Sequence, residues 1–207
     1  HVRVSFDAPQ FTAETIAMGT LNLLEAMRAI CPDSRMYQAG SSEMFGNSID
    51  KDGFQRETTP MNPVSPYGCA KVFAHNICKN YRSSYDLFVS NGILFNHESP
   101  RRGGTFVTNK IVRGAMDIFE GKTKNLSLGN LESSRDWGHS KDYVKAMWMM
   151  LQHETPLDVV CATGKSHQVK DVVAYVFGKL ELLPTEQFIT VDPKYFRPQE
   201  LDNLRGD

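Results

Sequence analysis

Residues Ser65 to His97 carry the sequence SPYGCAKVFAHNICKNYRSSYDLFVSNGILFNH, in which a helical stretch leads into a largely apolar one. Ser65 as N-cap and Pro66 at the first helical position favour a helix start, so we predict a helix from Ser65 to about Tyr85. The apolar residues from Leu87 to His97 predict a strand that is buried on both faces. A helix followed by a buried strand is the repeating unit of parallel α/β sheets.

Helical and strand patterns alternate in the same way on either side of this unit. Apolar residues recur at helical spacing between Phe11 and Ile30, and the sequence RMYQAGS (35–41) predicts a short buried strand. Further predicted helices cover residues 105–121, 141–153 and 169–180, and further predicted strands cover residues 158–164 and 188–192. This order predicts the α/β class, with a parallel sheet and helices packed on it.

Composition narrows the class of protein. The 207 residues suit one large domain or two small ones, and a hydrophobic content of 41% is enough to form a core. The net charge of −1 argues against a general nucleic-acid or membrane-surface binder. No run of 18 apolar residues is present, so no transmembrane span is expected. The first ten residues, HVRVSFDAPQ, have the pattern of neither a signal peptide nor a transit peptide, and they lack an initiator Met.

The four cysteines indicate the redox environment. Cys31, Cys69, Cys78 and Cys161 form no CxxC pair, and no histidine lies near them at a ligand-like spacing. We therefore expect reduced thiols, no metal site and a cytoplasmic protein.

Polar residues follow both of the buried strands first described. Ser41, Ser42 and Glu43 follow the first strand, and Asn96, His97 and Arg102 end or follow the second. Ligands of open α/β sheets lie beyond the carboxyl ends of the strands. We therefore expect these hydroxyl, carboxylate, imidazole and guanidinium groups to gather on one rim.

Tyr67 and Lys71 are four residues apart, so they share one face of the predicted helix. A phenol with a pKa near 10 is a poor base, but a neighbouring ammonium and a bound nicotinamide cation would lower that pKa. With Ser41 holding the substrate oxygen, the trio could take a proton from an alcohol whose carbon gives up a hydride. The YxxxK pattern is short and common, so an ordinary structural role stays open.

Glu43 adds a group that a simple dehydrogenase does not need. It lies two residues after Ser41, where its carboxylate could remove a proton next to a ketone made by oxidation. The alternative is a solvated or helix-capping glutamate.

Five segments together resemble the GDP-mannose 4,6-dehydratases, which are extended short-chain dehydrogenases/reductases. They are AGSSEMFG, SPYGCAK, NGILFNHESPRRG, LGNLESSRDWGHSKDYVKAMWMML and VDPKYFRPQELDNLRGD. The resemblance implies an incomplete Rossmann-like parallel sheet with helices on both faces, plus a smaller mixed α/β substrate-binding part. Residues 1–97 would be the C-terminal portion of the NADP-binding domain, to which strand 158–164 returns. Residues 98–207 would mainly bind the GDP-sugar.

The resemblance also implies a mechanism. Tyr67 would deprotonate the C4 hydroxyl of the mannose as hydride passes to NADP+, and Lys71 would hold the nicotinamide ribose. Glu43 would remove H5 and assist loss of the C6 hydroxyl as water, after which the hydride returns to C6. The product would be GDP-4-keto-6-deoxymannose. Ser41 stands where many members carry threonine, and it keeps the hydroxyl.

Ligand contacts are implied in the same way. Those to NADP would come from Phe11, Lys71, His97 and Arg102, with Phe11 at the place of a tyrosine in relatives. Those to GDP-mannose would come from Ser42, Asn96, Asn109, Lys110, Arg135 and Arg197. Guanidinium and ammonium groups suit a diphosphate, although surface salt bridges are the alternative for the two arginines. A homodimer or homotetramer joined through the helices that start near Phe11 and Ser65 is also implied.

No glycine-rich dinucleotide loop is present, although the family begins with one. The resemblance therefore implies that the first third is absent, together with the tail beyond Asp207 and part of an insertion before residue 188. A fragment of a longer enzyme is one explanation. The other is a truncated protein, whose central strands would have exposed apolar edges.

Two other functions stay open. A related dehydratase or epimerase could act on a UDP- or dTDP-sugar, but epimerases do not need Glu43, and other dehydratases carry Asp-Glu where this chain has Ser42-Glu43. The second alternative is a non-catalytic, dehydrogenase-like oligomerisation module. The presence of Ser41, Glu43, Tyr67 and Lys71 together argues against that module.

Overall fold

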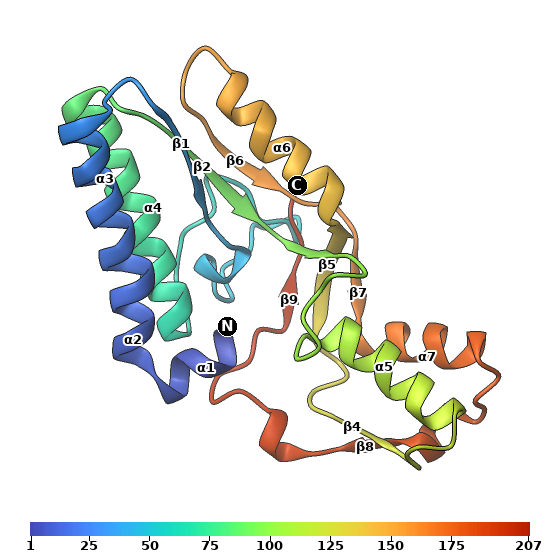
Figure 1. The fold of residues 1–207 in the computed structure, drawn as a ribbon. Coiled ribbons are helices and arrows are strands. Elements are labelled where there is room, and N and C mark those ends of the chain that lie inside the picture. The colour runs from blue at the N-terminus through green and yellow to red at the C-terminus, as the bar shows by residue number, and fades with distance from the viewer.

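The computed structural model describes residues 1–207, and its centre is a parallel sheet of three strands. The strands are β1 (Arg35–Ala39), β2 (Phe88–Leu94) and β6 (Asp158–Cys161), in the order β1-β2-β6. Helices α4 (Pro66–Tyr85) and α6 (Ser140–Gln152) lie on opposite sides of this sheet (Figure 1). The predicted Rossmann-like arrangement, a parallel sheet with helices on both faces, is therefore confirmed.

The chain begins with one short helix and continues as one long helix. Helix α1 (Val2–Asp7) precedes α2 (Pro9–Ala13), a π-helical turn at Glu14–Met18 and α3 (Gly19–Ile30). Ala13, Glu14, Met18 and Gly19 all have right-handed helical backbone angles, so α2 to α3 run on without a break. The helix predicted between Phe11 and Ile30 is confirmed, whereas α1 and the π-helical turn were not predicted.

Helix α4 begins and ends as its sequence predicts. The Ser65 hydroxyl accepts a hydrogen bond of 3.0 Å from the Gly68 N–H, which satisfies one donor of the first turn. The helix ends at Asp86, whose φ of 55° lies in the left-handed region.

Residues on opposite faces of β2 belong to two separate apolar clusters. Val89 of β2 packs with Leu24 of α3 and Cys78 of α4. Leu94 of β2 packs with Tyr143 of α6 on the opposite face. This pattern is what a strand buried on both sides requires.

The predicted strand from Leu87 to His97 is in fact two strands. Strand β2 ends at Leu94, and β3 (Asn96–Glu98) pairs with β5 (Ser134–His139) instead of β6. Between them, the Phe95 N–H still donates to the Cys161 carbonyl. The pairing partner changes where the apolar residues of β2 give way to the polar residues of β3. Strand β3 therefore belongs to a second sheet.

That second sheet is mixed and is built from short strands. Strand β5 pairs with β3, with β7 (Ser166–Gln168) antiparallel and with β9 (Asn203–Leu204) parallel. A separate parallel pair joins β4 (Leu126–Leu128) to β8 (Ile189–Val191). Helices α5 (Val107–Phe119) and α7 (Val169–Lys179) share a core with β4 that includes Ile111, Leu128 and Phe177.

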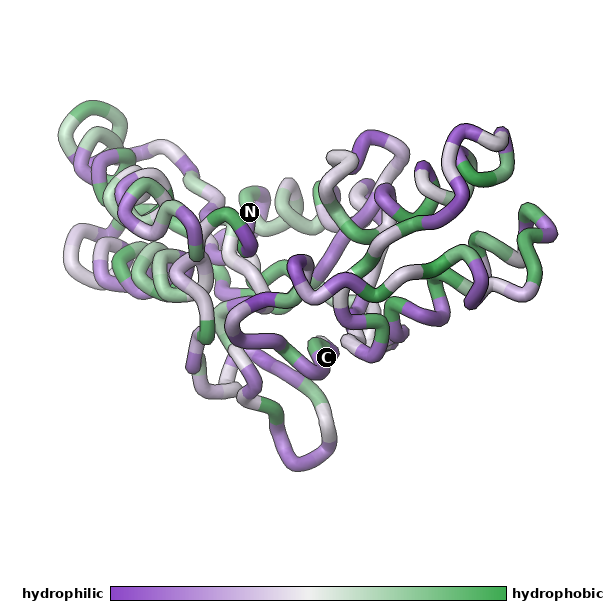
Figure 2. The backbone as a smooth tube through the Cα atoms, turned by 90° about the horizontal axis from the view of Figure 1, so that it is seen from below, coloured by the Kyte–Doolittle hydropathy of each residue, from purple (hydrophilic) through white to green (hydrophobic).

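Three 3₁₀ turns complete the chain, at Ser42–Met44, Thr185–Phe188 and Pro193–Tyr195. The group around α5 and α7 projects away from the helix-covered sheet, and purple and green segments alternate along the helices, as amphipathic helices require (Figure 2). No helix has the length and apolarity needed to cross a bilayer, and the four cysteines are unpaired.

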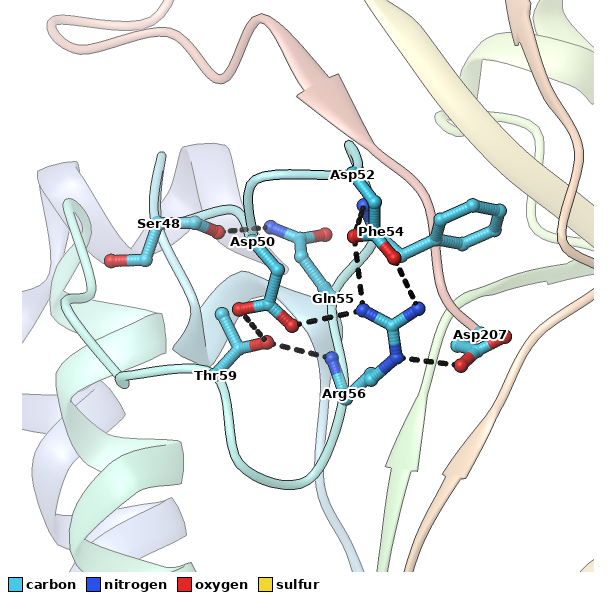
Figure 3. A network of polar contacts seen from close by, with 8 residues as sticks. All are labelled: Ser48, Asp50, Asp52, Phe54, Gln55, Arg56, Thr59 and Asp207. Carbon is cyan, nitrogen blue, oxygen red and sulfur yellow. Dashed lines mark hydrogen bonds and ion pairs between the residues drawn. The ribbon is translucent and has the colours of Figure 1, made fainter.

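A polar cluster fixes the C-terminal residues against the loop that follows Glu43 (Figure 3). Arg56 donates to the carboxylates of Asp50, Asp52 and Asp207. The neighbouring Gln55 is fully buried, and its backbone exchanges hydrogen bonds with Arg205 and Asp207. The last residues of the chain are thereby held beside the strand end that carries the predicted site.

We expect Gly40→Ala to destabilise the fold by about 1–3 kcal/mol, because overpacking of this size forces backbone shifts. A Cβ at residue 40 would lie 2.5 Å from the Gly92 carbonyl oxygen, to which the Gly40 N–H donates at 2.7 Å. The free energy of unfolding in urea measures the effect. Gly178→Ala in α7 is the control, because nothing lies within 4 Å of its Cβ. Gly40→Ala with wild-type stability would contradict the prediction.

Candidate active site

A pocket of about 430 Å³ opens at the carboxyl ends of β1 and β2. The second sheet, the start of α5 and the segment after β8 form its other walls. Ten of the residues predicted from the sequence line it: Ser41, Ser42, Glu43, Tyr67, Asn96, His97, Arg102, Lys110, Arg135 and Arg197. The expected gathering of polar groups on one rim is therefore what the structure shows.

Ser41, Tyr67 and Lys71 lie together, although Lys71 is not turned into the pocket. The Ser41 hydroxyl caps the 3₁₀ turn that follows it, accepting from the Glu43 N–H at 3.3 Å. Lys71 Nζ donates to the Ala39 carbonyl at 2.9 Å and lies 5.6 Å from the centre of the Tyr67 ring. Helix α4 thus places the phenol at the strand end and the ammonium behind it.

Burial raises the pKa of the Tyr67 phenol, which differs from the lowering expected from the sequence. A hydrogen bond with Ser41 lowers this pKa, the charge of Glu43 raises it, and the charge of Arg102 lowers it, but burial outweighs the rest. Burial also lowers the pKa of Lys71. The phenol is therefore held in its neutral form until further positive charge comes close.

Glu43 is neither solvated nor only a helix cap. Its side chain is 10% exposed, and Oε1 accepts from Arg197 Nη1 at 3.0 Å. Its second oxygen, Oε2, is buried without a hydrogen-bond partner. This places a carboxylate with one free oxygen in the same pocket as Ser41 and Tyr67.

Arg135 is a buried cation without a carboxylate partner. The residue is 7% exposed, and its guanidinium donates to the carbonyls of Ser134 and Leu201. Burial, and next the charge of Arg197, lower the pKa of Arg135 to about 10. Because a buried charge without a counter-ion is costly, this arrangement indicates a site for an anionic ligand. The surface salt-bridge alternative is wrong for Arg135, and Arg197 pairs inside the pocket.

Besides Lys71, two predicted ligand-binding residues do not line the pocket. Phe11 lies on α2, is 66% exposed and is not among the residues that line the pocket. Asn109 uses its side chain within the protein, donating to the Arg102 carbonyl and accepting from Arg113. Asn109 therefore holds the loop that carries Arg102 and does not line the pocket.

Three of the remaining predicted residues contact other side chains or the backbone. His97 Nδ1 lies 2.9 Å from the Phe95 carbonyl oxygen, and its ring stacks on Tyr143. Arg102 lies over the Phe106 ring and 3.3 Å from a Glu98 oxygen. Lys110 Nζ lies 3.6 Å from the centre of the Tyr195 ring.

Sequence reasoning missed Tyr195 and Glu200 as pocket residues. Glu200 Oε1 accepts from the backbone N–H of Arg197 at 2.9 Å. Their only signal was their nearness to Arg197 in the sequence YFRPQE.

Buried polar atoms of Ser133 and Trp137 also line the pocket without a hydrogen-bond partner, as does Glu43 Oε2. Such atoms indicate a pocket that takes a polar ligand. Nowhere in residues 1–207 do three or more His, Cys, Asp or Glu side chains group as a metal site requires.

A parallel sheet with Ser41, Tyr67 and Lys71 at its strand ends defines the class of extended short-chain dehydrogenases/reductases. Solved structures agree on the fold: dTDP-glucose 4,6-dehydratase from Bacillus anthracis in complex with NAD matches with a TM-score of 0.81 and 24% identity over 94% of this chain and 59% of that one. RMD from Pseudomonas aeruginosa complexed with NADPH matches with a TM-score of 0.83 and 22% identity over 100% of this chain and 68% of that one.

Sequence comparison assigns the chain to one family within this class. The GDP-mannose 4,6 dehydratase family model matches residues 1–207, so the chain belongs to that family. Over the whole chain it is 52% identical to GDP-mannose 4,6 dehydratase 2 of Arabidopsis thaliana and covers 56% of that protein. It is 46% identical to GDP-mannose 4,6 dehydratase of Homo sapiens and covers 60% of it. The chain thus spans less than two thirds of the length of these curated relatives.

Proposed function

We propose that the protein containing these residues dehydrates GDP-mannose to GDP-4-keto-6-deoxymannose, with internal hydride transfer through NADP. The observation that carries the proposal is the position of Glu43, with one free carboxylate oxygen, in the same pocket as Ser41 and Tyr67. Membership of the GDP-mannose 4,6 dehydratase family supports the substrate. Another sugar-nucleotide dehydratase or epimerase, or a non-catalytic module, has less support.

A nicotinamide cofactor fits the residues behind the pocket. Lys71 Nζ has three donors and uses one of them, on the Ala39 carbonyl, so two are left for ribose hydroxyls. The ends of β1 and β2 are where a dinucleotide lies in sheets of this kind. The bound cofactor would accept and return the hydride. Of the two solved structures compared above, one is in complex with NAD and the other with NADPH, and we propose NADP here, with His97 and Arg102 among its ligands.

Each pocket residue then has a defined step. Ser41 holds the sugar C4 oxygen, and Tyr67 takes its proton once positive charge outweighs the burial of the phenol, with Arg102 already acting in that direction. The resulting ketone acidifies H5, and Glu43 removes that proton and delivers it to the C6 hydroxyl, which leaves as water. Arg135, Arg197 and Lys110 would hold the diphosphate, because guanidinium and ammonium groups pair well with phosphate oxygens.

We also propose a cytoplasmic homodimer or homotetramer joined through α2, α3 and α4. The exposed apolar side chains Phe11, Leu23 and Phe73 on these helices support this contact. Phe73 also lines an apolar hollow between the N-terminal helix and α4, together with Pro9, Ala13, Ala17, Pro66, Cys69 and Ala70. In this arrangement Phe11 would serve assembly rather than cofactor binding.

Incubation of the full-length protein and NADP with GDP-mannose, a UDP-sugar and a dTDP-sugar tests the activity. We expect a 4-keto product, detected by its absorbance in alkali, from GDP-mannose alone and without net reduction of NADP. A 4-keto product from another sugar nucleotide would overturn the substrate. An epimer formed without dehydration would favour the epimerase, and no product from any sugar would favour the non-catalytic module.

A further inference from the structure

Glu43, the proposed base, forms an ion pair with Arg197, which lines the same pocket. Arg197 Nη1 lies 3.0 Å from Glu43 Oε1, and the side chains of the pair are 26% and 10% exposed. One of the two carboxylate oxygens is therefore taken up by the guanidinium, and the other is buried without a partner. In this arrangement the carboxylate is engaged before any substrate is bound.

Arg197 can move without disturbing the fold around it. It lies between the last 3₁₀ turn and β9, outside any helix or strand. Its backbone is fixed, because its N–H donates to Glu200, but its guanidinium has no hydrogen bond other than that to Glu43. One ion pair alone therefore sets the orientation of this side chain.

Arg135 differs from Arg197 in each of these respects. It belongs to β5, it is buried, and two backbone carbonyls hold its guanidinium. The charges of Glu43 and Arg197 both act on it, so the three groups lie within electrostatic reach of one another. The pocket thus has one fixed cation without a carboxylate and one movable cation that a carboxylate holds.

A diphosphate attracted by Arg135 competes with Glu43 for Arg197. The diphosphate carries more negative charge than one carboxylate, and its oxygens can accept two parallel hydrogen bonds from one guanidinium. The other charged or titratable side chains of the pocket, which include Tyr67, Arg102 and Glu200, make no hydrogen bond to the Glu43 carboxylate. No second partner therefore holds the Glu43 carboxylate when Arg197 leaves.

We infer that Arg197 is shared between Glu43 and the diphosphate of the substrate, pairing with Glu43 in the free protein and releasing it when the nucleotide binds. The inference rests on the proposed function, because it takes Glu43 as the base and a sugar nucleotide as the substrate. Arg197 then determines specificity in two ways. It binds the nucleotide, and it keeps the base occupied against sugars that carry no diphosphate.

Coupling of this kind is reciprocal, so it is measurable from the nucleotide side without catalysis. GDP is the probe, because it has the diphosphate but no sugar to contact Glu43. In the full-length protein, we expect Glu43→Gln to bind GDP about fivefold or more tightly than wild type, measured by titration calorimetry. In an Arg197→Gln background the same substitution should give no gain. Glu186→Gln is the matched control, since it makes the same change from carboxylate to amide at an exposed residue that does not line the pocket, and its GDP affinity should equal that of wild type.

Each other outcome decides the question. An unchanged or weaker GDP affinity in Glu43→Gln overturns the sharing of Arg197. A gain that persists without Arg197 also overturns it, because direct repulsion between Glu43 and phosphate would then be the cause. If wild type binds UDP or dTDP but not GDP, the proposed substrate fails, and the same variants titrated with that nucleotide decide the inference. Should Glu43→Gln not fold, Glu43→Asp draws the carboxylate back from Arg197 and has the same expected direction.

Discussion

Tyr67→Phe should reduce turnover of GDP-mannose by about 10³-fold or more, within the range for loss of a positioned acid–base group. The substitution removes only the phenolic oxygen that takes the C4 proton, and the ring is kept in its buried place on α4. Neither neighbour of the phenol replaces it, because Ser41 is not a base and the Lys71 ammonium donates to the Ala39 carbonyl. The kcat for formation of the 4-keto product measures the loss.

Tyr37→Phe is the control for this prediction. The Tyr37 hydroxyl is also buried, but it has no hydrogen-bond partner and does not line the pocket. Its loss should leave both kcat and GDP affinity unchanged. Tyr67→Phe with near wild-type turnover would remove the phenol from the chemistry and leave the hydride step without a base.

The parts of the fold that the sequence predicts are those with local causes. Ser65 and Pro66 begin α4 because a hydroxyl cap and a fixed φ act within one turn. Strand β2 is buried along nearly its whole length, as its apolar run predicts. The strand predicted at 35–41 is present as β1, but it lies at the edge of the sheet and only Gln38 of it is buried, so the prediction that it is a buried strand is wrong. Strand β5 was not predicted, because it is short and polar and its pairing with β3, β7 and β9 is decided by distant residues.

The same distinction applies to the site. Ser41, Glu43 and Tyr67 could be predicted because strand ends of a parallel sheet meet on one edge. The pairing of Glu43 with Arg197 joins residues 154 positions apart, and no local pattern encodes it. The direction of the Tyr67 pKa shift was missed for a related reason, since the burial that raises this pKa depends on tertiary packing.

Glu43→Gln should reduce dehydration by about 10²- to 10⁴-fold, the range for removal of a general base. The amide keeps the size of the side chain but cannot accept H5. Hydride abstraction at C4 should persist, because Ser41, Tyr67 and Lys71 are unchanged. Two measurements separate the steps: the absorbance of enzyme-bound NADPH, which should still form when GDP-mannose is added, and release of the 4-keto-6-deoxy product, which should nearly stop.

Glu43→Asp separates the chemistry from the packing. It keeps a carboxylate but draws it back by one methylene, so activity between wild type and Glu43→Gln is expected if the charge is the base. If both variants lost activity equally and together with GDP binding, the role of Glu43 would be to shape the pocket. If Glu43→Gln dehydrated at the wild-type rate, the base would have to be another group.

The only other carboxylates lining the pocket are Glu98 and Glu200, of which Glu98 is engaged by Thr108 and Glu200 by the Arg197 N–H. Glu43 is thus the pocket carboxylate with a buried oxygen that no hydrogen bond occupies, and for this reason the largest loss of dehydration is expected at this residue.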